Sequence, residues 1–168
     1  MTLHIRFAAP SDNVTIEQIE NAADQVIIDR LAPQRWEPAP SAGSRAAEPG
    51  YILVAEETEG SAVIAFVHVL ELGQIAHLER LSVLPEHGRR GHGRALVEVA
   101  KNEARRRGYQ SLNLRTYADV PWNGPFYARA GFVETSPATD FHKHLAEVEE
   151  RLGLDLYGRR IQMTAALL

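Results

Sequence analysis

The chain has 168 residues, of which 45% are apolar and 24% are charged, and its formal net charge is -4 at pH 7. This balance is typical of a globular protein, and the length predicts that residues 1–168 form a single domain with a substantial core. The negative charge argues against a general nucleic-acid-binding protein, because such proteins usually carry a basic surplus. The absence of cysteine excludes disulfides and any mechanism that passes through an acylated thiol.

Two further classes of feature are not expected from the residue pattern. The first six residues lack the apolar run of a signal peptide, and about 18 uninterrupted apolar residues occur nowhere in the chain. We therefore expect a cytoplasmic protein with no membrane partner and no nucleic-acid partner. No metal site is expected either, because metal-ligand spacing is missing around the scattered histidines, which include His4, His68, His87, His142 and His144.

The first half of the chain is predicted to contain four strands and one helix. Loose alternation over residues 3–8 indicates a strand, and apolar residues at helical spacing indicate an amphipathic helix over 15–31. Residues 32–50 are rich in Pro, Ala, Ser and Gly, and loops of that length are often functional. Strands at 51–56, 62–70 and 75–83 follow, and the short turns between them predict an antiparallel run.

The second half alternates helices with strands. A helix is predicted to begin near Gly93, to run to residue 107 and to stop at Gly108. It would bury one face, made of Leu96, Val97, Ala100 and Ala104. The remaining predicted elements are, in chain order, a strand at 112–116, a short helix at 122–130, a strand at 132–134, a helical segment at 141–152 and a last strand at 160–165. This order predicts a mixed α/β (α+β) fold, with a mostly antiparallel mixed sheet flanked by helices.

The most informative segment is residues 81–96, where an apolar strand runs into a turn with three glycines and three arginines and then into a helix. Glycine lets the backbone approach a ligand closely, and a helix N-terminus presents unpaired N–H groups to an anion. Arginine adds positive charge at the same place. Residues 88–94 therefore indicate a phosphate-binding turn. A P-loop would require a lysine that is missing here, and a Rossmann fingerprint would require a third glycine where Leu96 stands.

The turn resembles the pyrophosphate-binding turn of GNAT acetyltransferases, which reads Arg or Gln, two residues, Gly, any residue, and Gly or Ala. Gly91 and Gly93 match its two glycines, whereas Gly88 stands where the family usually has Gln or Arg. Residues 121–132 provide a second match, because they resemble the family's Tyr-x-x-x-Gly-Phe signature through Tyr127 and Gly131. Two matches in the expected order are far more specific than one glycine turn.

A third match is the strand at 75–83, which resembles the corresponding strand of serotonin N-acetyltransferase, a member of that family. Histidines occupy the positions of both His77 and Glu79 in that protein. The resemblance implies a GNAT domain that binds acetyl-CoA as co-substrate, without a metal, and transfers the acetyl group to a primary amine by direct attack in a ternary complex. The contacts that it implies for acetyl-CoA are made by Leu81, Ser82, Val83, Arg89, Arg90, Gly91, His92, Gly93 and Arg94. His92 itself is expected to face solvent within the turn.

Three residues are candidates for proton transfer. Tyr127 could simply pack in the core, but the pKa of a phenol, about 10, also suits it to protonate a departing thiolate. His77 and Glu79 could be polar residues on an exposed strand face. Strand alternation places both opposite Leu78, where one of them could take the proton that an ammonium must lose before it attacks.

The acceptor is expected to enter past residues 32–50 and the region of Trp122, so Trp36 and Trp122 are the candidate substrate-binding residues. The sequence leaves open whether the acceptor is a small-molecule amine or a peptide amine, and whether the protein is a monomer or a homodimer. Two other functions remain open at this point. One is a non-catalytic module that senses acetyl-CoA, and the other is an acyltransferase that uses a longer acyl-CoA or a hydroxyl acceptor.

Overall fold

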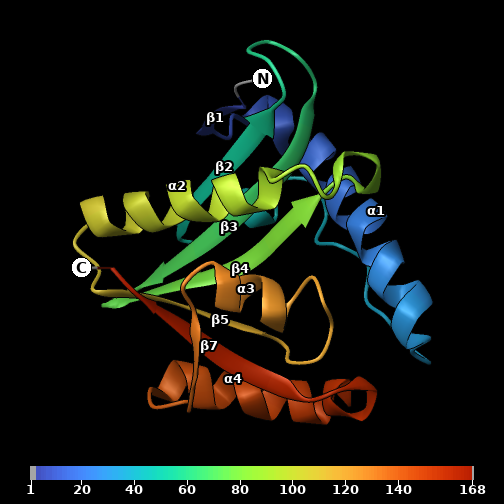
Figure 1. Ribbon diagram of the computed structural model, residues 1–168, viewed down its shortest axis with the longest axis vertical. Coiled ribbons are helices and arrows are strands. Elements are labelled where there is room, and N and C mark those ends of the chain that lie inside the picture. Colours follow the sequence, from blue (N-terminus) through green and yellow to red (C-terminus); the bar gives the residue numbers. More distant parts are fainter. Residues whose placement is uncertain (1–2, 168) are drawn as a thin grey trace.

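A computed structural model describes residues 3–167 and shows one mixed sheet of seven strands (Figure 1). The strands are β1 (His4–Phe7), β2 (Gly50–Glu56), β3 (Val63–Leu72), β4 (Ile75–Val83), β5 (Ser111–Tyr117), β6 (Val133–Thr135) and β7 (Arg160–Ala166). Their order across the sheet is β1-β2-β3-β4-β5-β7-β6. Only the β4–β5 pair is parallel, and the other five pairs are antiparallel. The predicted fold class is therefore confirmed.

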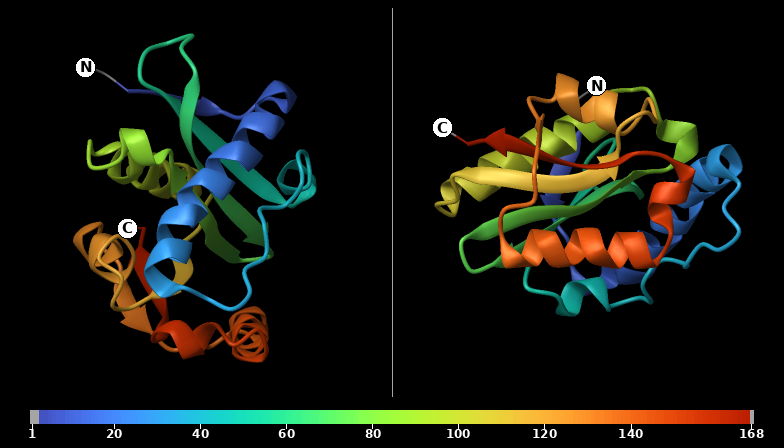
Figure 2. Two further views of the ribbon diagram at one scale, coloured as in Figure 1. Left: turned by 90° about the vertical axis from the view of Figure 1, so that its right-hand side faces the viewer. Right: turned by 90° about the horizontal axis from the view of Figure 1, so that it is seen from below.

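Four helices cover the two faces of the sheet (Figure 2). They are α1 (Asn13–Leu31), α2 (His92–Arg106), α3 (Gly124–Arg129) and α4 (Asp140–Arg151). Single 3-10 turns lie at Pro10–Asp12, Arg45–Ala47, Pro85–His87 and Leu154–Tyr157. Helices α2 and α3 pack on one face, and α1 and α4 pack on the opposite face. Among residues 3–167, no helix has both the length and the apolar character needed to span a bilayer.

The central strands are buried on both faces, which explains their nearly continuous apolar sequence. Ile52 and Val54 of β2 pack with Ile16 and Ile19 of α1, whereas the alternate residues of β2 join the core beneath α2. The predicted inner face of α2 is confirmed, because its four apolar residues are fully buried. The sheet therefore separates two layers of helices, and each layer has its own apolar core against the sheet.

The sheet opens between β4 and β5, and this opening positions the site. His68 of β3 is opposite Arg80 and Val69 is opposite Leu78, so Glu79 is the extra residue of a β-bulge in β4. In the described part of the chain, β4 and β5 are paired at one position, His77 with Asn113. Beyond that position the two strands separate, and the rest of β4 faces an open split.

Two elements near the site differ from the sequence prediction. The helix predicted over 122–130 is shorter, because α3 starts only at Gly124, and the turn before it contains Trp122. The strand predicted over 132–134 is shifted by one residue, because the Phe132 side chain packs into the core and β6 starts after it. The 32–50 segment is irregular, as predicted, apart from its single 3-10 turn.

Candidate active site

A cleft of about 740 Å3 lies where β4 and β5 separate. Its walls come from α1, the second half of β4, the glycine turn and the start of α3. Its lining includes Asp24, Arg80, Leu81, Ser82, Val83, Arg89, Gly91, His92, Gly93, Arg94, Trp122, Asn123, Phe126, Tyr127 and Arg129. All the residues predicted to contact acetyl-CoA are in this set except Arg90.

The glycine turn leaves free backbone donors at the end of this cleft. Gly91 caps α2 with φ of +82°, a left-handed conformation that glycine adopts without strain. The first hydrogen bond of α2 runs from Ala95 N–H to Gly91 C=O, so the N–H groups of residues 92–94 have no acceptor within the helix. Such a helix N-terminus stabilises a bound phosphate through these N–H groups and the helix dipole.

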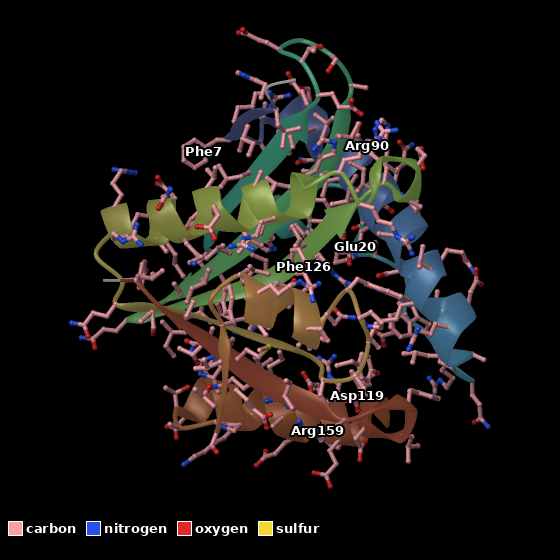
Figure 3. The ribbon with its side chains drawn as sticks, in the orientation of Figure 1. Phe7, Glu20, Arg90, Asp119, Phe126 and Arg159 are labelled. Carbon is pink, nitrogen blue, oxygen red and sulfur yellow. The ribbon has the colours of Figure 1, made fainter. Side chains whose placement is uncertain are left out.

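Side chains around the turn fit a long phosphorylated ligand. Gly93 lies close to three apolar side chains, since a Cβ on it would be 3.5 Å from Phe126 Cζ and 3.7 Å from atoms of Leu81 and Val83 (Figure 3 labels Phe126). The turn therefore approaches both β4 and α3. Arg89 and Arg94 add positive charge on the lining. The N–H donors and the positive charge suit the pyrophosphate of coenzyme A, and the apolar side chains beside the turn suit its pantetheine arm.

Two residues of the turn differ from expectation. Arg90 lies away from the cleft, where its Nη1 is 3.4 Å from Glu57 Oε1, and His87 also contacts that carboxylate. His92 was expected to face solvent, but it is half-buried, lines the cleft and has its Nε2 shielded from water. The reason is that α2 begins at His92, so its ring lies against the first turn of the helix.

Replacing Gly91 by valine tests the turn as the coenzyme A site. Coenzyme A at 100 times its dissociation constant should stabilise the wild-type protein by about 2.7 kcal/mol, which raises Tm by about 5 to 10 °C. NAD and ATP should do much less. Gly91→Val should abolish the effect of coenzyme A, because a β-branched residue resists the left-handed conformation that aims the N–H groups.

Gly108 offers a matched control at the other end of α2. Its φ is +95°, and a Cβ on it, like one on Gly91, would meet nothing within 4 Å. Gly108→Val should therefore lose similar intrinsic stability and keep the full Tm rise with coenzyme A. A normal Tm rise in Gly91→Val would show that the turn is not the site.

Tyr127 lies in the wall of the cleft, on α3. It is buried, with 7% of its surface exposed, and its ring packs edge-on against Phe126 and Phe132. Burial raises the pKa of the Tyr127 phenol above its ordinary value. The phenol therefore remains protonated at neutral pH, which suits it to act as a proton donor and not as a base.

Glu79 and His77 lie on the opposite side of the sheet from α2, as predicted. Glu79 Oε2 is 3.8 Å from His77 Nε2, and the Glu79 side chain is 37% exposed whereas His77 is 3% exposed. Partial burial raises the pKa of Glu79, although Arg45 and Arg80 oppose this effect. Burial, with smaller contributions from His142 and Arg115, lowers the pKa of His77 to about 3. At neutral pH, His77 is therefore an uncharged imidazole behind Glu79.

The two predicted substrate-binding tryptophans have different positions. Trp122 is 43% exposed, lines the cleft and lies under the guanidinium of Arg30, whose Cζ is 5.4 Å from the ring centroid. Trp36 is half-buried and reaches the site only through Asp24, with Nε1 3.4 Å from Oδ2. Asn123 accepts a hydrogen bond from Thr116 Oγ1 at 2.9 Å, so its side chain fixes the start of α3 to β5.

Sequence reasoning missed a buried ionic network between α1 and β4. Glu20, 1% exposed and labelled in Figure 3, accepts bonds from Arg45 Nε and Nη2 at 2.8 and 2.9 Å and lies 2.9 Å from Arg80 Nη2. Arg80 Nη1 also donates to Asp24 at 3.0 Å. The network links the 32–50 loop through Arg45 to the bulged strand. One signal was available, because Glu20 and Asp24 interrupt the apolar stripe of α1.

Between residues 3 and 167, no group of three or more His, Cys, Asp or Glu side chains could hold a metal ion.

Comparisons with known proteins agree with this geometry. A family model described as an acetyltransferase (GNAT) domain matches residues 48–134. PaiA N-acetyltransferase from Thermoplasma acidophilum, solved in complex with coenzyme A, is 15% identical with a TM-score of 0.72, and the match covers 99% of each chain. Ribosomal-protein-S18-alanine N-acetyltransferase from Escherichia coli is 22% identical with a TM-score of 0.70, covering 99% of this chain and 94% of the other. A GNAT-family acetyltransferase from Staphylococcus aureus is 12% identical with a TM-score of 0.70, covering 99% and 100%.

Proposed function

Because this chain belongs to the GNAT family of acetyltransferases, and is thus an acyltransferase that depends on acyl-CoA, we propose that it acetylates a primary amine by direct attack in a ternary complex. Residues 1–168 act in this proposal as one GNAT domain. The observation that carries it is the split between β4 and β5, which has the phosphate turn at one end and Tyr127 in its wall, while Glu79 is the neighbour in β4 of the lining residue Arg80. Acetyl-CoA supplies the activated acetyl thioester.

Glu79 is the base in this proposal. An amine acceptor is protonated at neutral pH and has no lone pair with which to attack. The carboxylate of Glu79 attracts the ammonium and accepts its proton, which leaves a neutral carboxylic acid and a neutral amine. His77 is too weak a base for this step, since its pKa is about 3. It serves instead as a neutral neighbour of Glu79.

The backbone of β4 stabilises the negative charge that develops on the acetyl oxygen. Leu84 N–H donates to Ile64 C=O of β3 at 2.9 Å. N–H directions alternate along a strand, so the N–H of Val83 points the other way, toward the split. A backbone N–H aimed at a developing oxyanion is a strong contributor to catalysis. Tyr127 then donates its phenol proton to the departing sulfur, and the second proton that the attacking nitrogen loses as the amide forms restores the phenol.

A thiol-release assay with acetyl-CoA against a panel of amines tests the function. The panel should contain polyamines, arylalkylamines, an aminoglycoside and a peptide with N-terminal alanine, the last because the Escherichia coli relative acts on a ribosomal-protein alanine. We expect turnover with at least one of these amines. Binding of coenzyme A without turnover on the whole panel, and turnover with hydroxyl acceptors alone, would each contradict the proposal.

Glu79→Gln should lower kcat/KM about 10- to 100-fold for a cationic acceptor, because both the charge and the basic oxygen are lost. In the wild-type protein, kcat/KM should fall as the pH drops through the pKa of Glu79, which burial raises above the ordinary value for glutamate. Glu79→Gln should lack this acidic limb. A second rise near pH 10 would belong to the amine itself and should persist in the variant.

Glu48 is the matched control, because it is an exposed glutamate whose charge acts on Glu79. Glu48→Gln removes the same charge nearby and should change kcat/KM only a few-fold, with the acidic limb retained. An acidic limb that survives unchanged in Glu79→Gln would assign the base elsewhere.

A further inference from the structure

Two buried histidines lie between α4 and the sheet, and each has a ring nitrogen without a partner. His77 on β4 is 3% exposed and His142 on α4 is 2% exposed. Within the described residues, Nδ1 of His77 and Nε2 of His142 have no hydrogen-bond partner. The ring centroids are 5.4 Å apart, and Phe141 packs edge-on against both rings. Buried polar atoms are rarely left unpaired, so this pair requires an explanation.

The cap of α4 allows Nδ1 of His142 to act as an acceptor. Thr139 Oγ1 accepts the backbone N–H of His142 at 3.1 Å and lies 2.7 Å from its ring Nδ1. The hydroxyl keeps its own hydrogen while it accepts that bond, and it can donate this hydrogen to Nδ1. Burial lowers the pKa of His142, and the ring is neutral. The single ring proton of His142 is then on Nε2, the nitrogen that lacks an acceptor.

A proton on Nε2 of His142 needs an acceptor nearby, and Nδ1 of His77 is a buried ring nitrogen without a partner. We propose that His142 Nε2–H donates to Nδ1 of His77 through one bridging water, and so holds His77 as the tautomer whose Nε2–H faces the carboxylate of Glu79. His142 is then a positioning residue for the base. This inference rests on the proposed role of Glu79, although the tautomer of His77 can be measured without any reaction. A water-mediated hydrogen bond of this kind is nearly as favourable as a direct one.

The consequence is a polarised chain from the cap of α4 to the active-site carboxylate. A donor N–H beside Glu79 stabilises its charged form, whereas a flipped tautomer would turn a lone pair toward the carboxylate and disfavour that form. The other charged groups that act on Glu79 are Arg45, Arg80, Glu48 and Glu20. Those that act on His77 are Arg115 and Glu149, which are themselves paired at 2.9 Å. Among these groups, only the histidine pair can change from stabilising the charged form of Glu79 to disfavouring it when a ring proton of His77 moves from Nε2 to Nδ1.

The first experiment measures the tautomers directly. The full-length protein is labelled with 15N-histidine, and the ring nitrogens of His77 and His142 are assigned by comparison with His77→Gln and His142→Gln. We expect both rings to be neutral at pH 7 with the proton on Nε2. A His77 proton on Nδ1 would overturn the proposal, and this result is measured on the wild-type protein once the signals are assigned.

The second experiment measures the effect on Glu79 by following its 13C carboxyl shift against pH. His142→Gln keeps an N–H donor near the position of Nε2, whereas His142→Met fills similar space without a donor. We expect the Glu79 midpoint to rise by about 0.5 to 1 pH unit in His142→Met and to stay near the wild-type value in His142→Gln. Equal shifts in the two variants, or no shift in either, would overturn the proposal.

Neither measurement requires an acceptor amine, so the two proposals fail separately. If Glu79→Gln retains full turnover on the amine panel while the tautomers are as expected, the assignment of the base is wrong and the histidine chain stands. If the tautomers differ while Glu79→Gln loses activity, the base stands and His142 has no positioning role.

Discussion

Tyr127→Phe is expected to lower kcat by roughly 10- to 1000-fold while the affinity for acetyl-CoA stays near that of the wild-type protein. The phenol lines the cleft and is held protonated by its burial, so it can donate a proton to the departing sulfur. Its hydroxyl matters only when negative charge appears on that sulfur, and the loss should therefore lie in the chemical step. Single-turnover kinetics with acetyl-CoA, together with binding measured by titration calorimetry, checks both parts.

Tyr51 is a suitable control for this substitution. It is a buried tyrosine of the same core cluster, but its hydroxyl donates to Ala100 C=O at 2.8 Å, away from the cleft. Tyr51→Phe should reduce stability by about 1 kcal/mol and leave kcat unchanged. If chemistry limits the rate and Tyr127→Phe keeps wild-type kcat, Tyr127 is a packing residue and another group protonates the thiolate.

Glu20→Gln is expected to reduce the free energy of unfolding by about 3 kcal/mol, more than Tyr51→Phe does. This loss corresponds to a Tm decrease of about 6 to 12 °C. The carboxylate is 1% exposed and holds two guanidiniums, those of Arg45 and Arg80. Removing its charge leaves Arg45, whose side chain is only 11% exposed, without a counter-ion. The expected loss of stability is at the lower end for a broken buried ion pair, because Arg80 is 33% exposed and keeps its ion pair with Asp24. Denaturant titration measures the loss.

Asp29 provides the control on the same helix. It is exposed and accepts a hydrogen bond from Gln25 Nε2 at 2.8 Å. Asp29→Asn should change stability by no more than about 0.5 kcal/mol. If Glu20→Gln were as mild as Asp29→Asn, the network would be only a solvated surface feature, and the 32–50 loop would have to be held on α1 by other contacts, such as that of Asn21 with Ala39 N–H at 2.9 Å.

The fold was largely predictable because its elements carry strong local signals. Apolar periodicity located every helix and strand to within about three residues, and Gly91 and Gly108 marked the two ends of α2 correctly. The cleft followed from the strand-turn-helix pattern, since local sequence determines where a helix N-terminus lies. Trp122 and Tyr127 were placed beside it by the second motif.

What could not be predicted depends on pairings between distant residues. The bulge at Glu79 is defined by its register with β3, and neither strand alone shows it. The burial of His77 depends on α4, more than 60 positions further along the chain, whose packing the sequence did not indicate. The role of Glu20 could not be predicted, because its partners Arg45 and Arg80 are 25 and 60 residues away.

The place of β7 between β5 and β6 bears on how the protein folds. β7 pairs with both of these strands, and β6 has no other neighbour in the described sheet. The hairpins of β2, β3 and β4 join strands that are close in sequence, so they can form while the chain is still being synthesised. The β5 side of the sheet has to wait for residues 160–166, which form some of the last contacts to be made. The half that carries the glycine turn can therefore assemble early, whereas the split between β4 and β5 takes its final shape only when the last strand is inserted.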